Sequence, residues 1–92
     1  MKGIVTITDD NKILIMLDGD WRLPQQIMRC LSEAAPGLAQ ATTIHLTSRN
    51  GKDQPSLSLE VMDAELAVQF KHTIQMVRAL KEANIIQTAE LA

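Results

Sequence analysis

The sequence predicts an α+β fold, a two-layer β-β-α-β-β-α arrangement in which a four-stranded, mostly antiparallel sheet carries two helices on one face. Residues 55–62 read PSLSLEVM, and their apolar side chains recur at every second position. This alternation is typical of a strand with one buried and one solvated face. Asp63 and a long stretch with helical spacing follow at once. A half-buried strand that leads directly into a helix indicates a sheet covered on one side, while the strand order stays open.

The first part of the chain is expected to form a hairpin. Residues 3–8 are rich in β-branched side chains, which favour a strand. Residues 12–17 read KILIML and form the second strand. The residues between them, Asp9, Asp10 and Asn11, are turn formers, and so short a connection favours antiparallel pairing.

A short helix is expected over residues 24–34. Pro24 suits its first turn, where the missing N–H costs nothing. Apolar side chains then recur three and four residues apart and form a buried stripe, namely Ile27, Leu31 and Ala34, with Cys30 beside it. Pro36 and Gly37 end this helix, and residues 38–41 are expected to form a loop.

A second pair of strands follows. Residues 42–48 read TTIHLTS and form the third strand. Asn50 and Gly51 supply the positive φ angles that a tight turn needs, within a loop over residues 49–54. This loop leads to the fourth strand, residues 55–62.

The second helix is expected over residues 64–83, with the Asp63 carboxylate as its N-terminal cap. Its predicted core stripe consists of Leu66, Phe70, Ile74, Val77 and Leu80, and its predicted water-facing side chains are Lys71, Gln75, Arg78 and Glu82. Asn84 stops the helix, residues 85–86 pack back on the sheet, and residues 87–92 form a frayed tail.

Composition limits the class of protein. A chain of 92 residues predicts one domain, residues 1–92, and 46% hydrophobic with 22% charged residues is globular. Nine basic against eleven acidic residues argue against general nucleic-acid binding. A single cysteine, Cys30, excludes an intramolecular disulfide and indicates a reducing compartment. Because the sequence shows neither a signal-peptide pattern nor an apolar run of membrane-spanning length, we expect a cytoplasmic protein that does not bind membranes.

Residue types that carry chemistry are present without a recognisable motif. His45 and His72 are interpreted as solvated or hydrogen-bonded histidines. Residues 18–20 (DGD) lack the further oxygen ligands of a calcium loop, so a turn between strand and helix is favoured. Cys30 lies on an apolar stripe and is interpreted as a small buried hydrophobe. We therefore expect no catalytic residue, no metal site and no cofactor.

The outer face of the sheet carries the strongest functional signal. The side chains expected to face the helices are Val5, Ile7, Ile13, Ile15, Leu17, Ile44, Leu46, Leu57, Leu59 and Val61. The apolar side chains that then point outward are Ile4, Leu14, Met16 and Met62. A strand that is apolar on both faces is usually covered on both, and an exposed apolar patch marks an interaction surface. Trp21 is interpreted as a plug over the core or, alternatively, as a partner anchor together with Arg22.

Three functions stay open. The favoured one is a small non-enzymatic protein-interaction or regulatory module, homodimeric, which binds itself or another protein through the outer sheet face. The alternative is a nucleic-acid-binding module, although the chain has few aromatic side chains to stack bases. The third is a small enzyme with a site at a subunit interface that uses His45 or the pair Asp18 and Asp20. The order β-α-β-β-α within the chain resembles that of small recombinase-modulating proteins, but their acidic, aromatic-rich final helix is missing, so no function follows.

Overall fold

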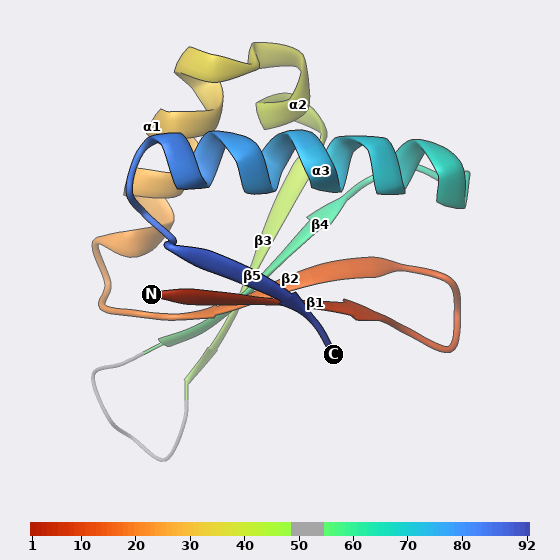
Figure 1. Cartoon of the computed structure of the whole chain (residues 1–92), viewed down its shortest axis with the longest axis horizontal. Helices are drawn as coiled ribbons and strands as arrows, with labels where there is room; N and C mark the ends of the chain where they lie inside the picture. The colour runs from red at the N-terminus through yellow and green to blue at the C-terminus, as the bar shows by residue number, and fades with distance from the viewer. Residues whose placement is uncertain (49–54) are drawn as a thin grey trace.

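The computed structural model describes residues 1–48 and 55–92, and these form one five-stranded sheet with three helices on one of its faces (Figure 1). The elements are β1 (Lys2–Ile7), β2 (Ile13–Asp18), α1 (Leu23–Ala34), α2 (Pro36–Ala41), β3 (Thr42–Ser48), β4 (Pro55–Val61), α3 (Leu66–Glu82) and β5 (Thr88–Leu91). The strand order is β3-β4-β2-β1-β5, and every neighbouring pair is antiparallel except β1 and β5. The predicted α+β class and the placement of the helices on one face are confirmed.

The predicted number of strands is wrong, because residues 88–91 form an edge strand instead of a frayed tail. Ile86 is fully buried, and the backbone N–H of Gln87 donates to the carbonyl of Met1 over 2.9 Å. These two contacts direct the end of the chain along β1, where β5 pairs in parallel and makes the sheet mixed. Four residues with the sequence TAEL carry too little pattern to be recognised as a strand without that neighbour.

The predicted loop at residues 38–41 is also wrong, because these residues belong to the short helix α2. Pro36 ends α1 as expected, but it stands in the first turn of α2, where its missing N–H is no loss. Leu38 and Ala39 of α2 are buried, and the Thr42 hydroxyl donates to the carbonyl of Leu38 over 2.7 Å. The predicted turn at residues 50–51 lies outside the described residues.

The core lies between the helices and the inner face of the sheet. Its fully buried large side chains are Ile15, Ile27, Leu31, Leu57, Leu59, Met76, Leu80 and Ile86. Two predicted inner positions, Ile7 and Leu46, are instead about half exposed. Ile7 is the last residue of β1, and Leu46 lies in the half of edge strand β3 that extends away from the helices (Figure 1). The remaining members of the predicted inner face are buried or half-buried.

The predicted core stripe of α3 is confirmed at Leu80, which is fully buried, and Val77 is half-buried against the core, but its first three members are wrong. Leu66, Phe70 and Ile74 are exposed, whereas the buried residues of α3 are Gln69, Thr73, Met76, Ala79 and Leu80. The predicted water-facing side chains Lys71, Gln75, Arg78 and Glu82 are indeed exposed. The helix therefore turns a partly polar stripe towards the sheet and leaves much of its apolar stripe uncovered.

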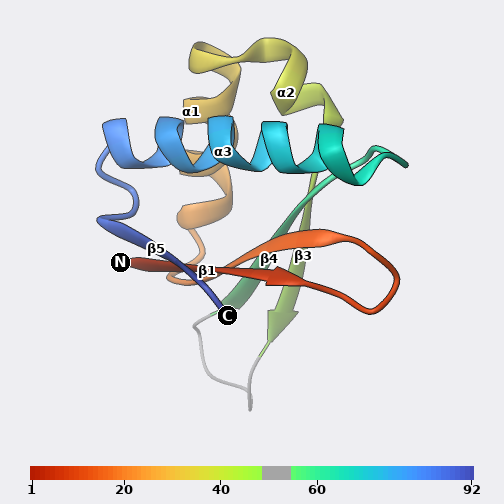
Figure 2. The ribbon, with the colours of Figure 1, turned by 45° about the vertical axis from the view of Figure 1, so that its right-hand side comes forward.

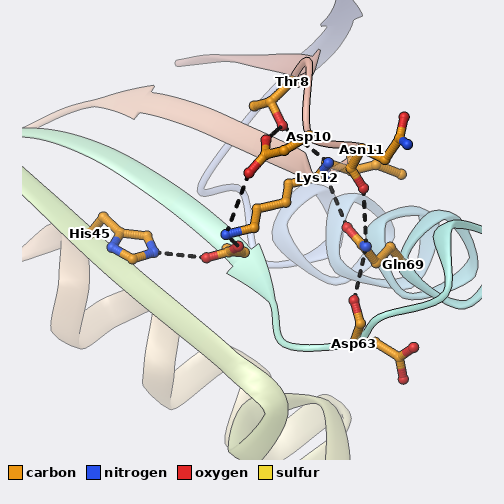
Figure 3. Close-up of polar contacts among 9 residues, drawn as sticks. Thr8, Asp10, Asn11, Lys12, His45, Asp63 and Gln69 are labelled. Atoms are coloured by element: carbon orange, nitrogen blue, oxygen red, sulfur yellow. Dashed lines mark hydrogen bonds and ion pairs between the residues drawn. The ribbon is translucent and has the colours of Figure 1, made fainter.

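The side chain of Gln69 explains this orientation (Figure 3). Its Oε1 accepts the backbone N–H of Ile13 over 3.0 Å, and its Nε2 donates to the carbonyls of Asp63 and Asn11 over 2.9 and 3.3 Å. One amide thus ties the start of α3 to the start of β2, and a buried N–H left unpaired would cost about 1–3 kcal/mol. The Asp63 carboxylate accepts the N–H of Glu65, which itself stands at the N-cap of α3, so the predicted cap at Asp63 is two residues too early.

Candidate interaction surface

A groove between α3 and the edge strand β5 is an unfilled apolar feature of the helix-bearing side. This α3–β5 groove has a volume of about 270 Å³ and is lined by Val5, Phe70, Thr73, Ile74, Val77, Ala89, Glu90 and Leu91. Six of these eight residues are apolar, so the groove offers water few hydrogen-bonding partners. Such a surface gains free energy when another apolar surface covers it.

The groove is open because of where α3 lies on the sheet. α3 packs mainly on β2 and β4 and has α1 on its other side, where the thiol of Cys30 reaches the carbonyl of Ala79 over 3.4 Å. In Figure 2, α3 crosses above the sheet with α1 behind it, while β1 and β5 run below its front flank. Phe70 therefore remains 53% exposed, Ile74 47% and Leu91 71%.

The sheet edge next to the groove is also uncovered. β5 pairs with β1 on one side, and within residues 1–48 and 55–92 the sheet order places no strand on its other side. An edge strand presents a row of N–H and C=O groups to an incoming chain. Ala89 and Leu91 share a sheet face with Gly3 and Val5, their partners in β1, so the backbone edge and the apolar groove lie side by side.

The outer sheet face, which sequence analysis favoured, is only modestly apolar. The register places Ile4 beside Met16 and Thr6 beside Leu14, so the structure does bring Ile4, Leu14 and Met16 together. Ile4 and Leu14 are half-buried, and Met16 is 38% exposed. A hollow of about 350 Å³ at this face is lined by Met1, Lys2, Ile4, Met16, Leu17, Asp18, Ser56 and Leu57, a set that mixes charge with apolar side chains.

The other predicted interface residues do not join this patch. Met62 is exposed just after β4, next to the residues of β4 that pair with Leu14. Trp21 and Arg22 follow β2 at its other end. Trp21 is 54% exposed, so it does not act as the favoured plug over the core. Arg22 is held by an ion pair with Asp20 at 2.8 Å.

A polar cluster around Glu60 occupies the same outer face (Figure 3). Glu60 is buried, its Oε2 lies 3.0 Å from Nε2 of His45, and its Oε1 lies 3.4 Å from Nζ of Lys12. The hydrogen bond from His45, followed by the charge of Lys12, holds the pKa of Glu60 below its ordinary value. Both carboxylate oxygens of Glu60 have partners within the cluster, which is typical of a structural contact.

The residues considered for catalysis make structural contacts. In the part of the chain that the structure describes, no hydroxyl or thiol is hydrogen-bonded to His45, and no group of three or more metal-binding side chains occurs. The Asp18 carboxylate accepts from the Ser56 hydroxyl over 2.7 Å. Its neighbour Asp20 binds Arg22, which lowers the pKa of Asp20. Burial, with Glu33 and Glu82 nearby, raises the pKa of the Cys30 thiol, which favours its protonated form.

No family model, curated protein or solved structure matches this chain. Among the helices of the described ranges, none is long and apolar enough to cross a membrane.

Sequence reasoning missed the α3–β5 groove because it assigned Phe70 and Ile74 to the core. A signal was present, since Met76 and Leu80 lie on a different side of α3 from Ile74. When a helix has apolar residues on two sides, a single buried face cannot cover all of them. The other half of the groove, β5, gave no sequence signal.

Proposed function

We propose that this protein is a small non-enzymatic module that binds another protein chain through the α3–β5 groove. One observation carries the proposal: Phe70, the only phenylalanine of the chain, stands half-exposed in a groove whose walls are almost wholly apolar. Large side chains next to apolar pockets are typical anchors of protein interfaces. The adjoining edge of β5 adds backbone groups that can pair with a strand of the partner.

The outer sheet face is a weaker binding surface. Its apolar centre is small, and the charged side chains Lys2, Asp18, Glu60 and Glu90 surround it. The same mixture disfavours nucleic acid, because phosphates would meet acidic side chains without aromatic platforms to stack bases. Enzymatic function is disfavoured because, among the described residues, neither His45 nor Cys30 has the activating neighbour that catalysis needs.

Site-specific photocrosslinking in the cells that make the protein tests this proposal. We expect p-benzoylphenylalanine at position 70 to yield a discrete crosslinked product. The same probe at position 75, exposed on another side of α3, serves as the matched control and is expected to yield none. Adding Ile74→Asp to the probe at position 70 should abolish the product, because an unpaired carboxylate would enter the apolar contact. Equal labelling at positions 70 and 75 would overturn the proposal.

A further inference from the structure

We infer that the edge of β1 is a binding site for an extended segment of the partner, which takes the place of β5 and carries a large apolar side chain where β5 has Ala89. This inference rests on the proposed function, because it names the kind of segment that the same groove receives. The structure itself contains an occupant of the site, since β5 pairs with the edge of β1. The chemistry of the replacing segment follows from what β5 fills and what it leaves open.

Few side-chain contacts hold β5 on the sheet. Of its four residues only Ala89 is half-buried against the core, and Leu91 is 71% exposed. The ion pair between Lys2 and Glu90, at 2.9 Å, joins side chains that are both more than half exposed, and such pairs contribute little stability. Within residues 1–48 and 55–92, β1 and β5 also form the one parallel pair, and parallel pairing is slightly less stable per residue. Backbone hydrogen bonds therefore provide most of what holds β5.

The firm contacts of this part of the chain lie just before β5. Ile86 is fully buried, and the N–H of Gln87 donates to the carbonyl of Met1 over 2.9 Å. Residues 88–91 can separate from β1 while residues 86–87 keep their places, once the bond from the N–H of Ala92 to the carbonyl of Val5, at 2.8 Å, is also broken. A local opening of this kind costs less free energy than global unfolding.

The methyl group of Ala89 leaves the α3–β5 groove unfilled. Ala89 lines this groove together with Phe70, Ile74 and Val77, and about 270 Å³ remains open beside them. A leucine at the same place in another segment adds several carbon atoms on the groove side, and each buried CH₂ group strengthens binding about fourfold. Because β5 is tethered, it acts at an effective concentration on the order of millimolar, so only a segment that fills the groove better replaces it.

Titration of the isotope-labelled chain with synthetic peptides, followed by nuclear magnetic resonance, tests this inference. The probes are peptides of residues 87–92, one with the native sequence and one with Ala89→Leu. We expect the Ala89→Leu peptide to displace β5 at millimolar concentration, so that the amide signals of residues 88–91 move to random-coil positions and those of β1 shift. The native peptide should bind at least about tenfold more weakly, because it lacks only the side chain that enters the groove.

A peptide with Thr88→Leu is the matched control. Position 88 is exposed and alternates with Ala89, so its side chain lies on the outer face of the sheet, and this peptide should bind no better than the native one. Three results would overturn the inference: no binding of the Ala89→Leu peptide, equal binding of all three peptides, or binding that leaves the signals of residues 88–91 in place. If one of these is found while position 70 still crosslinks to another protein, the proposed function stands and only the replacement of β5 is wrong. If position 70 yields no crosslinked product, the proposed function itself is wrong.

Discussion

The core-facing residues of α1 and α3 were predicted by the same rule, and the two helices differ in which of those residues are buried. In α1 the spacing of apolar side chains identified Ile27, Leu31 and Ala34; the first two are fully buried, and Ala34, at the end of the helix, is exposed. In α3 the same spacing identified Leu66, Phe70, Ile74, Val77 and Leu80; the first three are exposed, Val77 is half-buried and Leu80 is fully buried. The buried face of α3 also contains Gln69 and Thr73.

The difference between the helices shows what an apolar stripe does and does not determine. α1 has one apolar side, so only one orientation buries it. α3 has apolar residues on two sides, and the buried amide of Gln69 decides which side turns inward. The side left outside is available to another chain, which is why α3 and not α1 carries the candidate interaction surface.

The largest expected effect contrasts one residue from each helix. Leu31→Ala should lower the free energy of unfolding by about 2–5 kcal/mol, because it leaves a cavity in the core. Phe70→Ala should lower it by less than about 1 kcal/mol in the monomer, because the ring is already half in water. Urea denaturation at low protein concentration measures both values. Equal losses would mean that Phe70 faces the core and that the orientation of α3 is wrong.

The next effect tests the amide that orients α3. Gln69→Met keeps the length of the side chain but leaves the N–H of Ile13 without its partner, so we expect a loss of about 1–3 kcal/mol. Gln75→Met, on an exposed part of the same helix, should change stability by less than about 0.5 kcal/mol. If Gln69→Met were as stable as the control, another interaction would have to fix the helix.

A smaller effect concerns the polar cluster beside the hairpin that Gln69 holds. The pKa of Glu60 is lowered in the folded state, so its carboxylate stabilises the fold above its ordinary pKa, and this contribution disappears as the pH falls through the folded pKa. Because His45 and Lys12 are half-exposed, water screens the pair, and we expect a contribution on the order of 0.5 kcal/mol. Urea unfolding between about pH 3 and pH 7 should show a shallower acid limb for Glu60→Gln than for the wild type. An unchanged acid limb would contradict this role of Glu60.

The smallest effect concerns the second buried polar residue of α3. The Thr73 hydroxyl donates to the carbonyl of Gln69 within the same helix, so its removal leaves no other chain segment unpaired. Thr73→Val should therefore change the free energy of unfolding by less than about 0.5 kcal/mol. Thermal unfolding checks this value, and a loss as large as that of Gln69→Met would show that the buried polar stripe acts as a unit.

The sequence by itself determined the elements whose pattern is local. Leu57, Leu59 and Val61 alternate with polar neighbours, and all three are buried on the inner face of β4 as predicted. The spacing of Ile27 and Leu31 in α1 is also a pattern among residues close in sequence. The same is true of the turn between β1 and β2. Asn84 ends α3 in a positive-φ conformation that asparagine tolerates, again as its residue type predicts.

Only the tertiary structure decided the strand order, the fifth strand and the face of α3. β5 exists because Ile86 and Gln87 bind residues from other parts of the chain and so place four weakly patterned residues beside β1. The orientation of α3 depends on hydrogen bonds between Gln69 and backbone groups more than fifty residues earlier in the sequence. Periodicity reports which sides of a helix are apolar, whereas the choice among those sides depends on partners that are distant along the chain. The α3–β5 groove arises from both choices together, and it therefore emerges only in the folded molecule.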